Sequence, residues 1–363
     1  MFVFLVSAAT IFLALITILP WLPWPHGLLR SCDFPRVQIA AVAVVLVAIT
    51  LLLGNGGPSS IILVVIQAAV VLVQALNCWH FTPLHGVQSL DYQGRLDAGN
   101  RIRILSANVK MSNRRFGALI DLVEEYQPDM VIAMEIDDAW LDALRPLRKE
   151  WAHVVEWPSD NAYGMVVLSK LALVDPEIRF LVFDNVPSVR TGVQLRTGEV
   201  IRLHAVHPEP PIPFEDTLGR DGELTKIATE VKNDPMPSIV AGDLNDVAWS
   251  RTTARFQRLS RLLDPRVGRG FFNTFDARFP FLRWPLDHVF HDARFRLVSI
   301  ERLTHIGSDH FPLMFELALQ ETERTGSAPP QADSQDRLEA QDVVSEASDL
   351  DREPVGSDWE KTN

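Results

Sequence analysis

Polar side chains suited to metal binding and proton transfer stand at the ends of apolar, strand-like runs in the middle of this 363-residue chain. A single polar residue at such a point is usually only a turn former. The positions concerned are Asn108, Glu135, His207, Asp243, Asn245, Asp287, Asp309 and His310. Eight residues of these types together predict one site that combines a metal ion with acid–base chemistry.

These residue types fit the hydrolysis of a phosphate ester. The carboxylate of Glu135 suits a hard cation, and Mg²⁺ typically takes one or two carboxylates together with water and substrate oxygens. Such a cation offsets the phosphate charge. A histidine oriented by a carboxylate can take a proton from the attacking water near neutral pH, and asparagine amides can donate to phosphate oxygens without adding negative charge.

The motifs that carry these residues resemble, in type and order, those of the endonuclease/exonuclease/phosphatase (DNase I-like) superfamily, in a bacterial membrane-anchored form. They are LSANV, AMEID, YGMVVLS, HAVHPEPP, AGDLND, PLDHVF and GSDHFPL, between Arg101 and Leu319. GDLN followed by GSDH is the most specific combination. The group contains pancreatic-type deoxyribonucleases, abasic-site endonucleases, sphingomyelinases and inositol-polyphosphate phosphatases. The resemblance implies an α+β fold, a four-layer α/β/β/α sandwich of two mixed sheets with the active site at one edge.

The resemblance also implies the ligands of the metal, which would be Mg²⁺ or Mn²⁺. Glu135 corresponds to the principal ligand, and Asn108 and Asp309 correspond to residues that bind or orient the ion. The chain departs from abasic-site endonucleases at Lys110, where they often carry an acidic residue, and at His207, where they carry a tyrosine. Both departures favour the deoxyribonuclease and sphingomyelinase branch.

The catalytic roles are implied in the same way. His310 corresponds to the general base, and Asp287 corresponds to the carboxylate that holds its ring. His207 matches the phosphate-contacting or general-acid histidine of the family. Asp243 and Asn245 match the GDxN pair that positions the nucleophile and the scissile phosphate.

Strand-like and helical patterns alternate from Arg101 onward, and these elements must position the site. Apolar runs predict strands at 101–107, 129–134, 164–168, 178–183, 189–195, 200–206, 238–241, 286–290, 295–300 and 313–317. Helical spacing predicts helices at 116–126, 138–145, 214–231 and 250–263. Many strands with a few helices indicate a layered α/β or α+β domain. His204 is expected to be structural, whereas His288 and His291 are expected to be surface or packing residues. Asp246 is expected to cap the following helix.

The first 80 residues have a different composition. Arg30, Asp33 and Arg36 are the only Asp, Glu, Lys or Arg residues before Leu90. Three apolar runs, Phe2–Leu19, Val37–Leu53 and Ile61–Trp79, each approach the ~20 residues that a helix needs to span a bilayer. A cleaved signal peptide is the alternative for the first run, but the run lacks a basic start. We therefore expect three transmembrane helices, without ionisable residues that would form a transport path.

Arginines also predict the orientation of these helices. Arg30 and Arg36 lie between the first two spans, whereas the second loop is uncharged, so the positive-inside rule places the first loop in the cytoplasm. After three spans the catalytic domain lies on the same side of the plasma (inner) membrane. A disulfide between Cys32 and Cys78 would instead indicate the oxidising periplasm.

Composition therefore divides the chain into four parts. Residues 1–80 form the membrane anchor, 81–100 a linker that gives reach without a fixed pose, and 101–320 the catalytic domain. Residues 321–363 hold 12 acidic and 4 basic residues, a net charge of −8 out of the overall −12, and this composition predicts a disordered tail. The sequence indicates no protein partner.

Eight arginines between Arg251 and Arg283, against two aspartates, form a basic segment in this acidic chain. Arg251, Arg255 and Arg258 share a helical face. This face is either a solvated helix surface or a substrate-binding surface for a polyanion, either nucleic acid or anionic phospholipid headgroups.

The first functional hypothesis is a membrane-anchored, metal-dependent endonuclease that hydrolyses nucleic-acid phosphodiesters, and the arginines favour it. The second is a phospholipid-directed phosphodiesterase, similar to sphingomyelinases, or an inositol-phosphate phosphatase; the membrane anchor favours a lipid substrate. The third is a catalytically inactive membrane adaptor, which the complete set of Glu, Asp, Asn and His residues disfavours.

Overall fold

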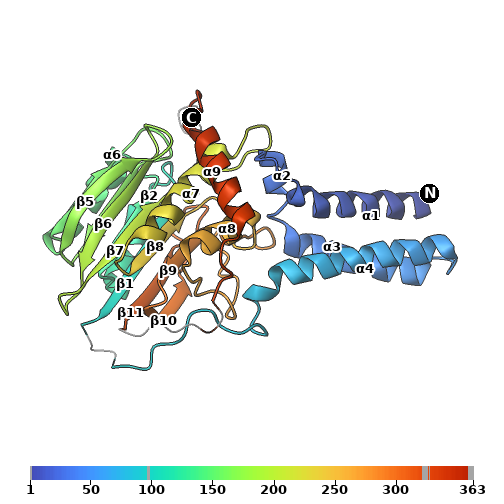
Figure 1. Ribbon diagram of the computed structural model, residues 1–363, viewed down its shortest axis with the longest axis horizontal. Coiled ribbons are helices and arrows are strands. Elements are labelled where there is room, and N and C mark those ends of the chain that lie inside the picture. Colours follow the sequence, from blue (N-terminus) through green and yellow to red (C-terminus); the bar gives the residue numbers. More distant parts are fainter. Residues whose placement is uncertain (1, 96–98, 321–325, 327, 359–363) are drawn as a thin grey trace.

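The computed structural model describes residues 2–95, 99–320, 326 and 328–358, and its strands form two sheets (Figure 1). The strands are β1 Arg101–Asn108, β2 Met130–Met134, β3 His153–Trp157, β4 Met165–Ser169, β5 Leu173–Phe180, β6 Pro187–Gln194, β7 Val200–Val206, β8 Ser238–Asp243, β9 Asp287–His291, β10 Phe295–Arg302 and β11 Leu313–Leu319. The first sheet has the order β10-β11-β1-β2-β4-β3, and the second β5-β6-β7-β8-β9. Each sheet contains one parallel pair, β1 with β2 and β7 with β8, so both are mixed.

Helices complete the layers. They are α1 Phe2–Ile18, α2 Gly27–Ser31, α3 Arg36–Leu53, α4 Pro58–Cys78, α5 Phe116–Tyr126, α6 Asp138–Leu144, α7 Leu218–Asn233, α8 Arg251–Ser260 and α9 Ser334–Ser348. α5 and α6 pack on the outer face of the first sheet, for example through Leu119 and Trp140. α7 and α8 pack on the second sheet through Leu224 and Phe256. The expected four-layer α+β sandwich is confirmed.

The two parallel pairs explain why distant residues meet. The carboxyl ends of parallel neighbours lie at the same edge of a sheet. Asn108 ends β1 while Glu135 follows β2, and His207 follows β7 while Asp243 ends β8. A buried core from the inner faces of both sheets holds these edges together.

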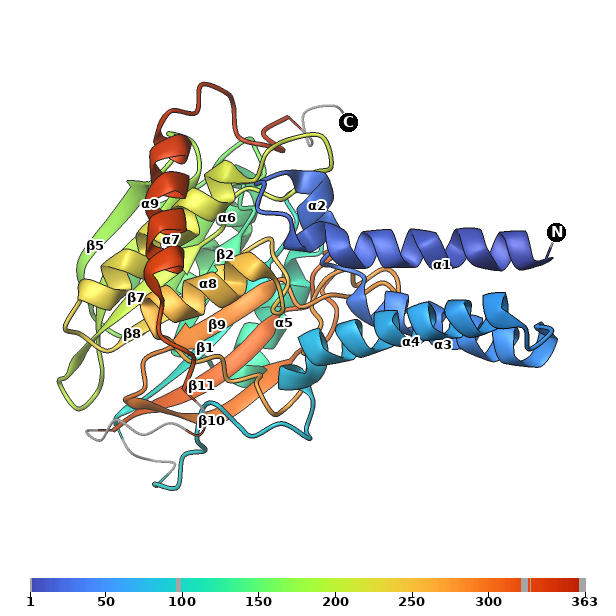
Figure 2. The same ribbon diagram turned by 45° about the vertical axis from the view of Figure 1, so that its right-hand side comes forward.

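Three helices, covering Val3–Trp21, Arg36–Leu53 and Pro58–Phe81 with their extensions, are long and apolar enough to cross a membrane. They lie side by side and project together from one side of the sandwich (Figures 1 and 2). Gln67 Nε2 donates to Thr10 Oγ1 at 2.8 Å, and Gln74 Nε2 donates to Thr17 Oγ1 at 2.8 Å. These bonds satisfy polar groups among apolar helices and tie α4 to α1.

The segments that flank the three apolar helices contact the sandwich directly. Gly27 N donates to Glu215 O at 2.8 Å, Trp249 Nε1 donates to Asp33 O at 2.7 Å, and Gln38 Nε2 donates to Phe281 O at 2.8 Å. The helix expected from residue 214 begins only at Leu218, because the preceding segment pairs with the chain around α2.

The linker follows the domain surface over much of its described length. Gln88 and Ser89 are buried, and Tyr92 N donates to Leu297 O at 2.8 Å. Gln88 Oε1 accepts from Asp264 N at 2.6 Å. Residues 96–98 of the expected linker lie outside the described residues. The structure thus gives the three apolar helices a defined position on the sandwich, whereas the composition of the linker predicts only reach.

The segment with a composition typical of disorder contains a helix. α9 begins with a capping box at Asp333 and packs on α7, where a Cβ on Gly222 would lie 2.4 Å from the Ala347 Cβ. The acidic residues that suggest disorder face arginines of α8, which offset their charge. Residues 321–325, 327 and 359–363 of the expected tail lie outside the described part.

Candidate active site

The eight residues singled out from strand ends converge at one edge of the sandwich. Seven of them line a pocket of about 360 Å³, and Asp287 lies behind His310. The seven are Asn108, Glu135, His207, Asp243, Asn245, Asp309 and His310. Residues separated by some 200 positions in sequence therefore share one cavity.

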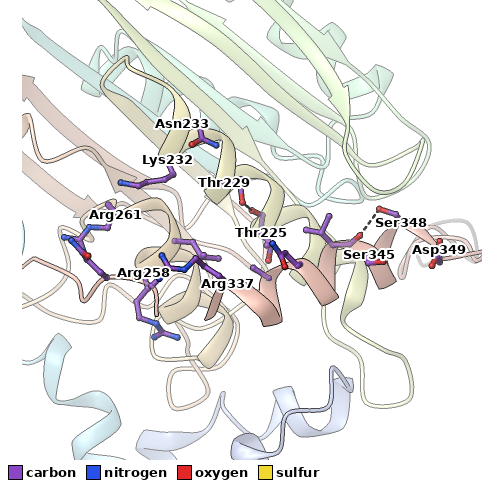
Figure 3. Close-up of a pocket in the computed structure, with 16 residues that line it drawn as sticks. Thr225, Thr229, Lys232, Asn233, Arg258, Arg261, Arg337, Ser345, Ser348 and Asp349 are labelled. Atoms are coloured by element: carbon purple, nitrogen blue, oxygen red, sulfur yellow. Dashed lines mark hydrogen bonds between the residues drawn. The ribbon is translucent and has the colours of Figure 1, made fainter. Parts of the chain in front are cut away.

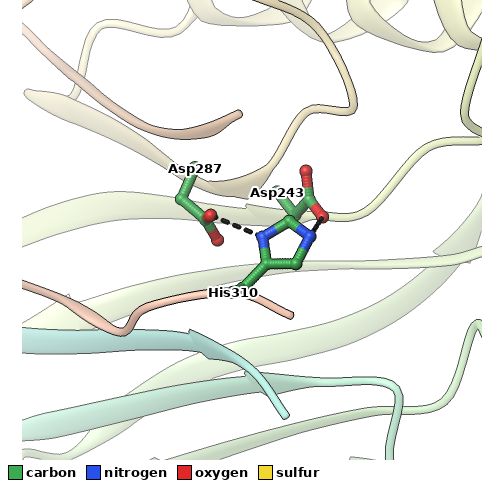
Figure 4. A group of neighbouring side chains, drawn as sticks. All are labelled: Asp243, Asp287 and His310. Atoms are coloured by element: carbon green, nitrogen blue, oxygen red, sulfur yellow. Dashed lines mark hydrogen bonds and ion pairs between the residues drawn. The ribbon is translucent and has the colours of Figure 1, made fainter. Parts of the chain in front are cut away.

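His310 lies between two carboxylates (Figure 4). Its Nδ1 donates to Asp287 Oδ2 at 2.8 Å, and its Nε2 is 3.4 Å from Asp243 Oδ2. Asp287 and Asp243 are register partners on β9 and β8, so the sheet fixes both sides of the ring. These three side chains are also close enough to hold a metal ion, but the bond to Asp287 occupies Nδ1 and leaves only Nε2 toward the pocket.

Two of these three side chains, His310 and Asp243, have shifted pKa values. Burial alone would lower the pKa of His310, but the negative charges of Asp243 and Asp287 outweigh it and raise that pKa to about 10. Burial raises the pKa of Asp243 to about 6, against the opposing effect of His310. The metal-free site therefore holds a proton on His310 at neutral pH.

A glycine turn positions Asp243 and Asn245. Gly242 has φ +144°, and a Cβ there would lie 2.0 Å from Val206 O, so only glycine fits. Asp243 Oδ1 accepts from Asn245 N at 2.9 Å, and Asn245 Nδ2 donates to Pro208 O at 2.9 Å. The turn directs the Asp243 carboxylate toward the pocket and holds the Asn245 amide at its wall.

Glu135 is the centre of the expected metal site. Its Oε1 accepts from Asn108 Nδ2 at 2.8 Å and its Oε2 from Met111 N at 3.2 Å. Its backbone is left-handed, with φ 62°, a conformation that non-glycine residues adopt mainly at constrained sites. Burial raises the pKa of Glu135 to about 7, and the charge of Asp309 adds to the shift. The carboxylate and amide oxygens gathered here are the donors that a hard divalent cation prefers.

Asp309 is held differently from the other carboxylates. Its Oδ2 lies 2.8 Å from Lys110 Nζ and 3.7 Å from the guanidinium of Arg278. Burial would raise its pKa, but His310 and Lys110 reverse the effect and lower it. Asp309 is therefore ionised and already paired, and it lines the same pocket as Glu135.

His207 is a neutral ring in this site. Its Nε2 lies 3.9 Å from Asp243 Oδ2, and its ring packs 5.7 Å from that of Tyr163. Burial lowers its pKa to about 3. Of the two roles expected for His207, contact with phosphate suits a neutral imidazole, whereas a general acid needs a proton that this ring does not hold at neutral pH.

The remaining histidines and Asp246 lie outside the pocket. His204 is buried away from it, and His288 and His291 are fully buried packing residues rather than surface residues. Asp246 does not cap α8. Ser250 is the cap, because its hydroxyl accepts from Thr253 N at 2.9 Å, while Asp246 accepts the hydroxyl of Ser250.

The structure does not bring Arg251, Arg255 and Arg258 to the pocket. Arg258 makes two hydrogen bonds to Asp336 on α9, at 2.7 and 2.6 Å. Arg251 and Arg255 face Glu339, also on α9. This arginine face binds a segment of its own chain. Arg258 also lines a separate cavity among α7, α8 and α9 (Figure 3), whose volume is about 770 Å³.

Arg258→Ala should therefore loosen α9 without reducing catalysis. We expect a loss of about 1 kcal/mol of unfolding free energy, since the bidentate pair is partly exposed. Chemical denaturation and limited proteolysis of the α9 segment would measure it, with Arg337→Ala, an exposed arginine on α9, as the control. A fall in turnover without a fall in stability would instead show that Arg258 binds substrate.

Several pocket residues escape prediction from the sequence. Phe34 comes from the loop before α3, and Val355 and Gly356 come from the segment after α9. The Tyr163 hydroxyl donates to Val355 O, and Val355 N donates to Glu209 Oε2 at 3.1 Å. Tyr163 stands in the YGMVVLS motif and could have been found there, whereas Phe34 and Val355 reach the pocket only through tertiary docking.

Comparisons with known proteins agree with this architecture. The sequence pattern of the Endonuclease/Exonuclease/phosphatase family matches residues 105–310. Among solved structures, the human Nocturnin catalytic domain with bound sulfate anion has a TM-score of 0.52 at 17% sequence identity, covering 62% of this chain and 97% of that one. D. rerio TDP2 complexed with single strand DNA product has a TM-score of 0.50 at 18% identity, covering 60% and 98%. No curated protein matches the sequence.

Proposed function

The chain belongs to the endonuclease/exonuclease/phosphatase family, and from that premise we propose that it is a membrane-anchored, divalent-metal-dependent phosphodiesterase. One observation carries the proposal. The Asp287–His310 pair, the Asp243–Asn245 turn and the Glu135–Asn108 pair all meet at a single pocket. This arrangement combines a proton acceptor, phosphate-directed amides and a carboxylate cation site.

His310 takes the proton of the attacking water. Asp287 fixes the ring through Nδ1, so Nε2 is the atom that accepts the proton. Positive charge beside Asp243 and Glu135 would offset the negative charge that stabilises protonated His310. The pKa of His310 would then fall toward the range of a general base at neutral pH. His207 and Asn245 donate to the phosphate oxygens.

The cation itself is Mg²⁺ or Mn²⁺ in this proposal. Glu135 would hold it together with Asn108 and Asp309, and when bound it supplies neutralisation of the phosphate charge. Asn108 also donates to Asp243 Oδ2 at 3.1 Å, which links the cation site to the proton acceptor. The oxygen-rich donor set suits such a hard ion better than zinc.

The three apolar helices would anchor the enzyme in the plasma membrane as a multi-pass protein, with the catalytic domain on the cytoplasmic side. The arginines of the first loop support this side. Cys32 and Cys78 are free.

The proposal is tested with the full chain in detergent micelles and soluble bis(p-nitrophenyl) phosphate. We expect Mg²⁺-dependent hydrolysis that a chelator abolishes and that Asp243→Asn lowers by about a hundredfold or more. Asp342→Asn, an exposed carboxylate on α9, serves as the control. A folded chain that hydrolyses no phosphodiester with either metal would support the inactive adaptor instead.

Nucleic acid loses its main support as the substrate. The arginine face that favoured a polyanion is engaged by α9, and the likeness to TDP2 concerns the fold. Both nucleic acid and phospholipid are phosphodiesters, so the choice between them depends on what surrounds the pocket.

A further inference from the structure

We propose that the substrate is a phosphodiester lipid of the same membrane that holds α1, α3 and α4, and that its headgroup enters the pocket from the bilayer surface. This inference rests on the proposed phosphodiesterase function and names its substrate class. Four features of the structure support it.

The anchor itself forms part of the pocket wall. Phe34 lines the pocket and stands two residues before the start of α3. Its ring packs edge-on against Trp284, with centroids 5.9 Å apart, and Trp284 stacks on Phe275 at 6.2 Å. Phe275 in turn contacts the ring of His310 at 4.9 Å. Three ring contacts therefore connect the turn just before an apolar helix to the catalytic histidine.

The ends of the helices locate the bilayer surface. The three candidate spans end near the domain at Trp21, Arg36 and Phe81, and all three project away from the same side of the sandwich (Figures 1 and 2). Tryptophan and arginine at these ends are typical of a membrane–water boundary. Because Phe34 lies beside Arg36, the pocket opens close to that boundary.

Two loops extend from the pocket walls to exposed aromatic tips. Pro210, Pro211 and Ile212 line the pocket, and the same loop carries Phe214, which is 90% exposed. Its far end is bound to the anchor, since Thr217 N donates to Pro25 O at 2.9 Å.

The second loop has the same construction. Arg278 lines the pocket, and Phe281, three residues later, is 87% exposed while its carbonyl accepts from Gln38 in α3. Within the described residues 101–320, six large apolar side chains are exposed, and four of them lie on these two loops. Apolar tips at this level fit insertion into the boundary of a bilayer.

The charge around the pocket favours a single headgroup over a polymer. Lys110 and Arg278 are the lysine and arginine side chains that line it, and both lie near Asp309. A nucleic-acid strand needs a basic track beyond the reacting phosphate. Arg251, Arg255 and Arg258, the arginines expected to form one, face α9 instead. A pocket of about 360 Å³ suits one phosphate and a small alcohol.

The reaction is an ordinary hydrolysis. The water oxygen forms a bond to phosphorus, one P–O ester bond breaks, and the water proton passes to His310 Nε2 and then to the departing alkoxide. The products are a phosphomonoester and an alcohol, one of which keeps the acyl chains.

The test uses the full chain reconstituted in vesicles with Mg²⁺. Phosphatidylglycerol, phosphatidylethanolamine or sphingomyelin is placed either in the same vesicle or only in separate protein-free vesicles. Soluble bis(p-nitrophenyl) phosphate and a single-stranded oligonucleotide are the competing substrates. We expect hydrolysis of at least one lipid, faster in the shared vesicle than in the separate one, and slower hydrolysis of the oligonucleotide.

Two variants test the loops. Phe214→Ser and Phe281→Ser should each lower the ratio of lipid to soluble-ester turnover by about tenfold, because a phenyl group that inserts into the bilayer boundary is lost. Leu338→Ser removes an exposed apolar side chain on α9 and should leave the ratio unchanged.

The outcomes separate the two proposals. Hydrolysis of the soluble ester or the oligonucleotide without any lipid would overturn the lipid inference and leave the phosphodiesterase standing. An unchanged ratio in both loop variants, or equal rates for shared and separate vesicles, would also overturn it. Absence of hydrolysis for every phosphodiester would overturn both the lipid inference and the proposed phosphodiesterase function.

Discussion

His310→Ala should lower the turnover of a soluble phosphodiester by about 10²–10⁴-fold, the range that a positioned general base contributes. The ring is the only group in the described pocket whose geometry suits proton acceptance on one nitrogen while a carboxylate fixes the other. Steady-state kinetics with saturating Mg²⁺ would measure the loss, and circular dichroism would show whether the fold persists.

The control for His310 is His153→Ala, a histidine on β3 outside the pocket. Asp287→Asn should also reduce turnover, because the ring would lose its fixed orientation. Wild-type rates in His310→Ala would exclude this residue as the base.

His310→Ala should also change how the unfolding free energy of the metal-free protein depends on pH. The pKa of His310 is raised to about 10 in the folded state, above the ordinary value near 6.5. Its stabilising contribution is therefore complete below about pH 6.5 and is lost as the pH rises through about 10. The difference in unfolding free energy between wild type and His310→Ala should shrink over that range.

The strand-end residues were predictable because the sheet topology brings polar residues that follow parallel strands to the same edge. Asn108 and Glu135 end neighbouring parallel strands, as do His207 and Asp243, and such ends meet at one edge whatever the loops between them do. The Gly242 turn adds a constraint that a sequence motif records directly. Local patterns therefore predicted the polar side of the pocket well.

The arginine face shows what a local pattern omits. Arg251 and Arg258 have the spacing of an exposed basic stripe, and nothing near them in sequence offsets their charge. Their partners, Glu339 and Asp336, lie some 80 residues later. A count of charges treats the basic α8 segment and the acidic C-terminal segment separately. The first then resembles a ligand-binding face, and the second resembles a disordered tail.

The start of α9 was nevertheless recorded in the sequence. Asp333 and Asp336 have the spacing of a capping box, a helix signal that the overall acidity of the segment obscured. For Phe34 no comparable signal exists. Its place in the pocket depends on how the anchor docks, and docking contacts such as Gly27 with Glu215 are made by backbone groups that carry no sequence signature.

Glu135→Gln should abolish the stabilisation of the protein by Mg²⁺ and reduce turnover by about 10³-fold, the effect of losing several kcal/mol of cation-dependent charge stabilisation. In the metal-free protein, burial raises the pKa of Glu135 to about 7, so the carboxylate that binds the ion is fully formed only above that pH. Mg²⁺ should therefore raise the unfolding temperature more at about pH 8 than at about pH 6.

Without metal, the contribution of Glu135 to the unfolding free energy should change with pH in the opposite direction to the Mg²⁺ effect. A carboxyl group whose pKa is raised on folding favours the folded state at low pH, and this contribution is lost as the pH rises from about 4.5 to about 7. The glutamine variant keeps a neutral side chain throughout, so without metal it should equal or exceed the stability of the wild type at about pH 8. Glu301→Gln, at an exposed position of β10, is the control in thermal unfolding with and without Mg²⁺. An unchanged Mg²⁺ effect in Glu135→Gln would show that the cation binds elsewhere, and the Asp243, Asp287 and His310 group would then be the next site to test.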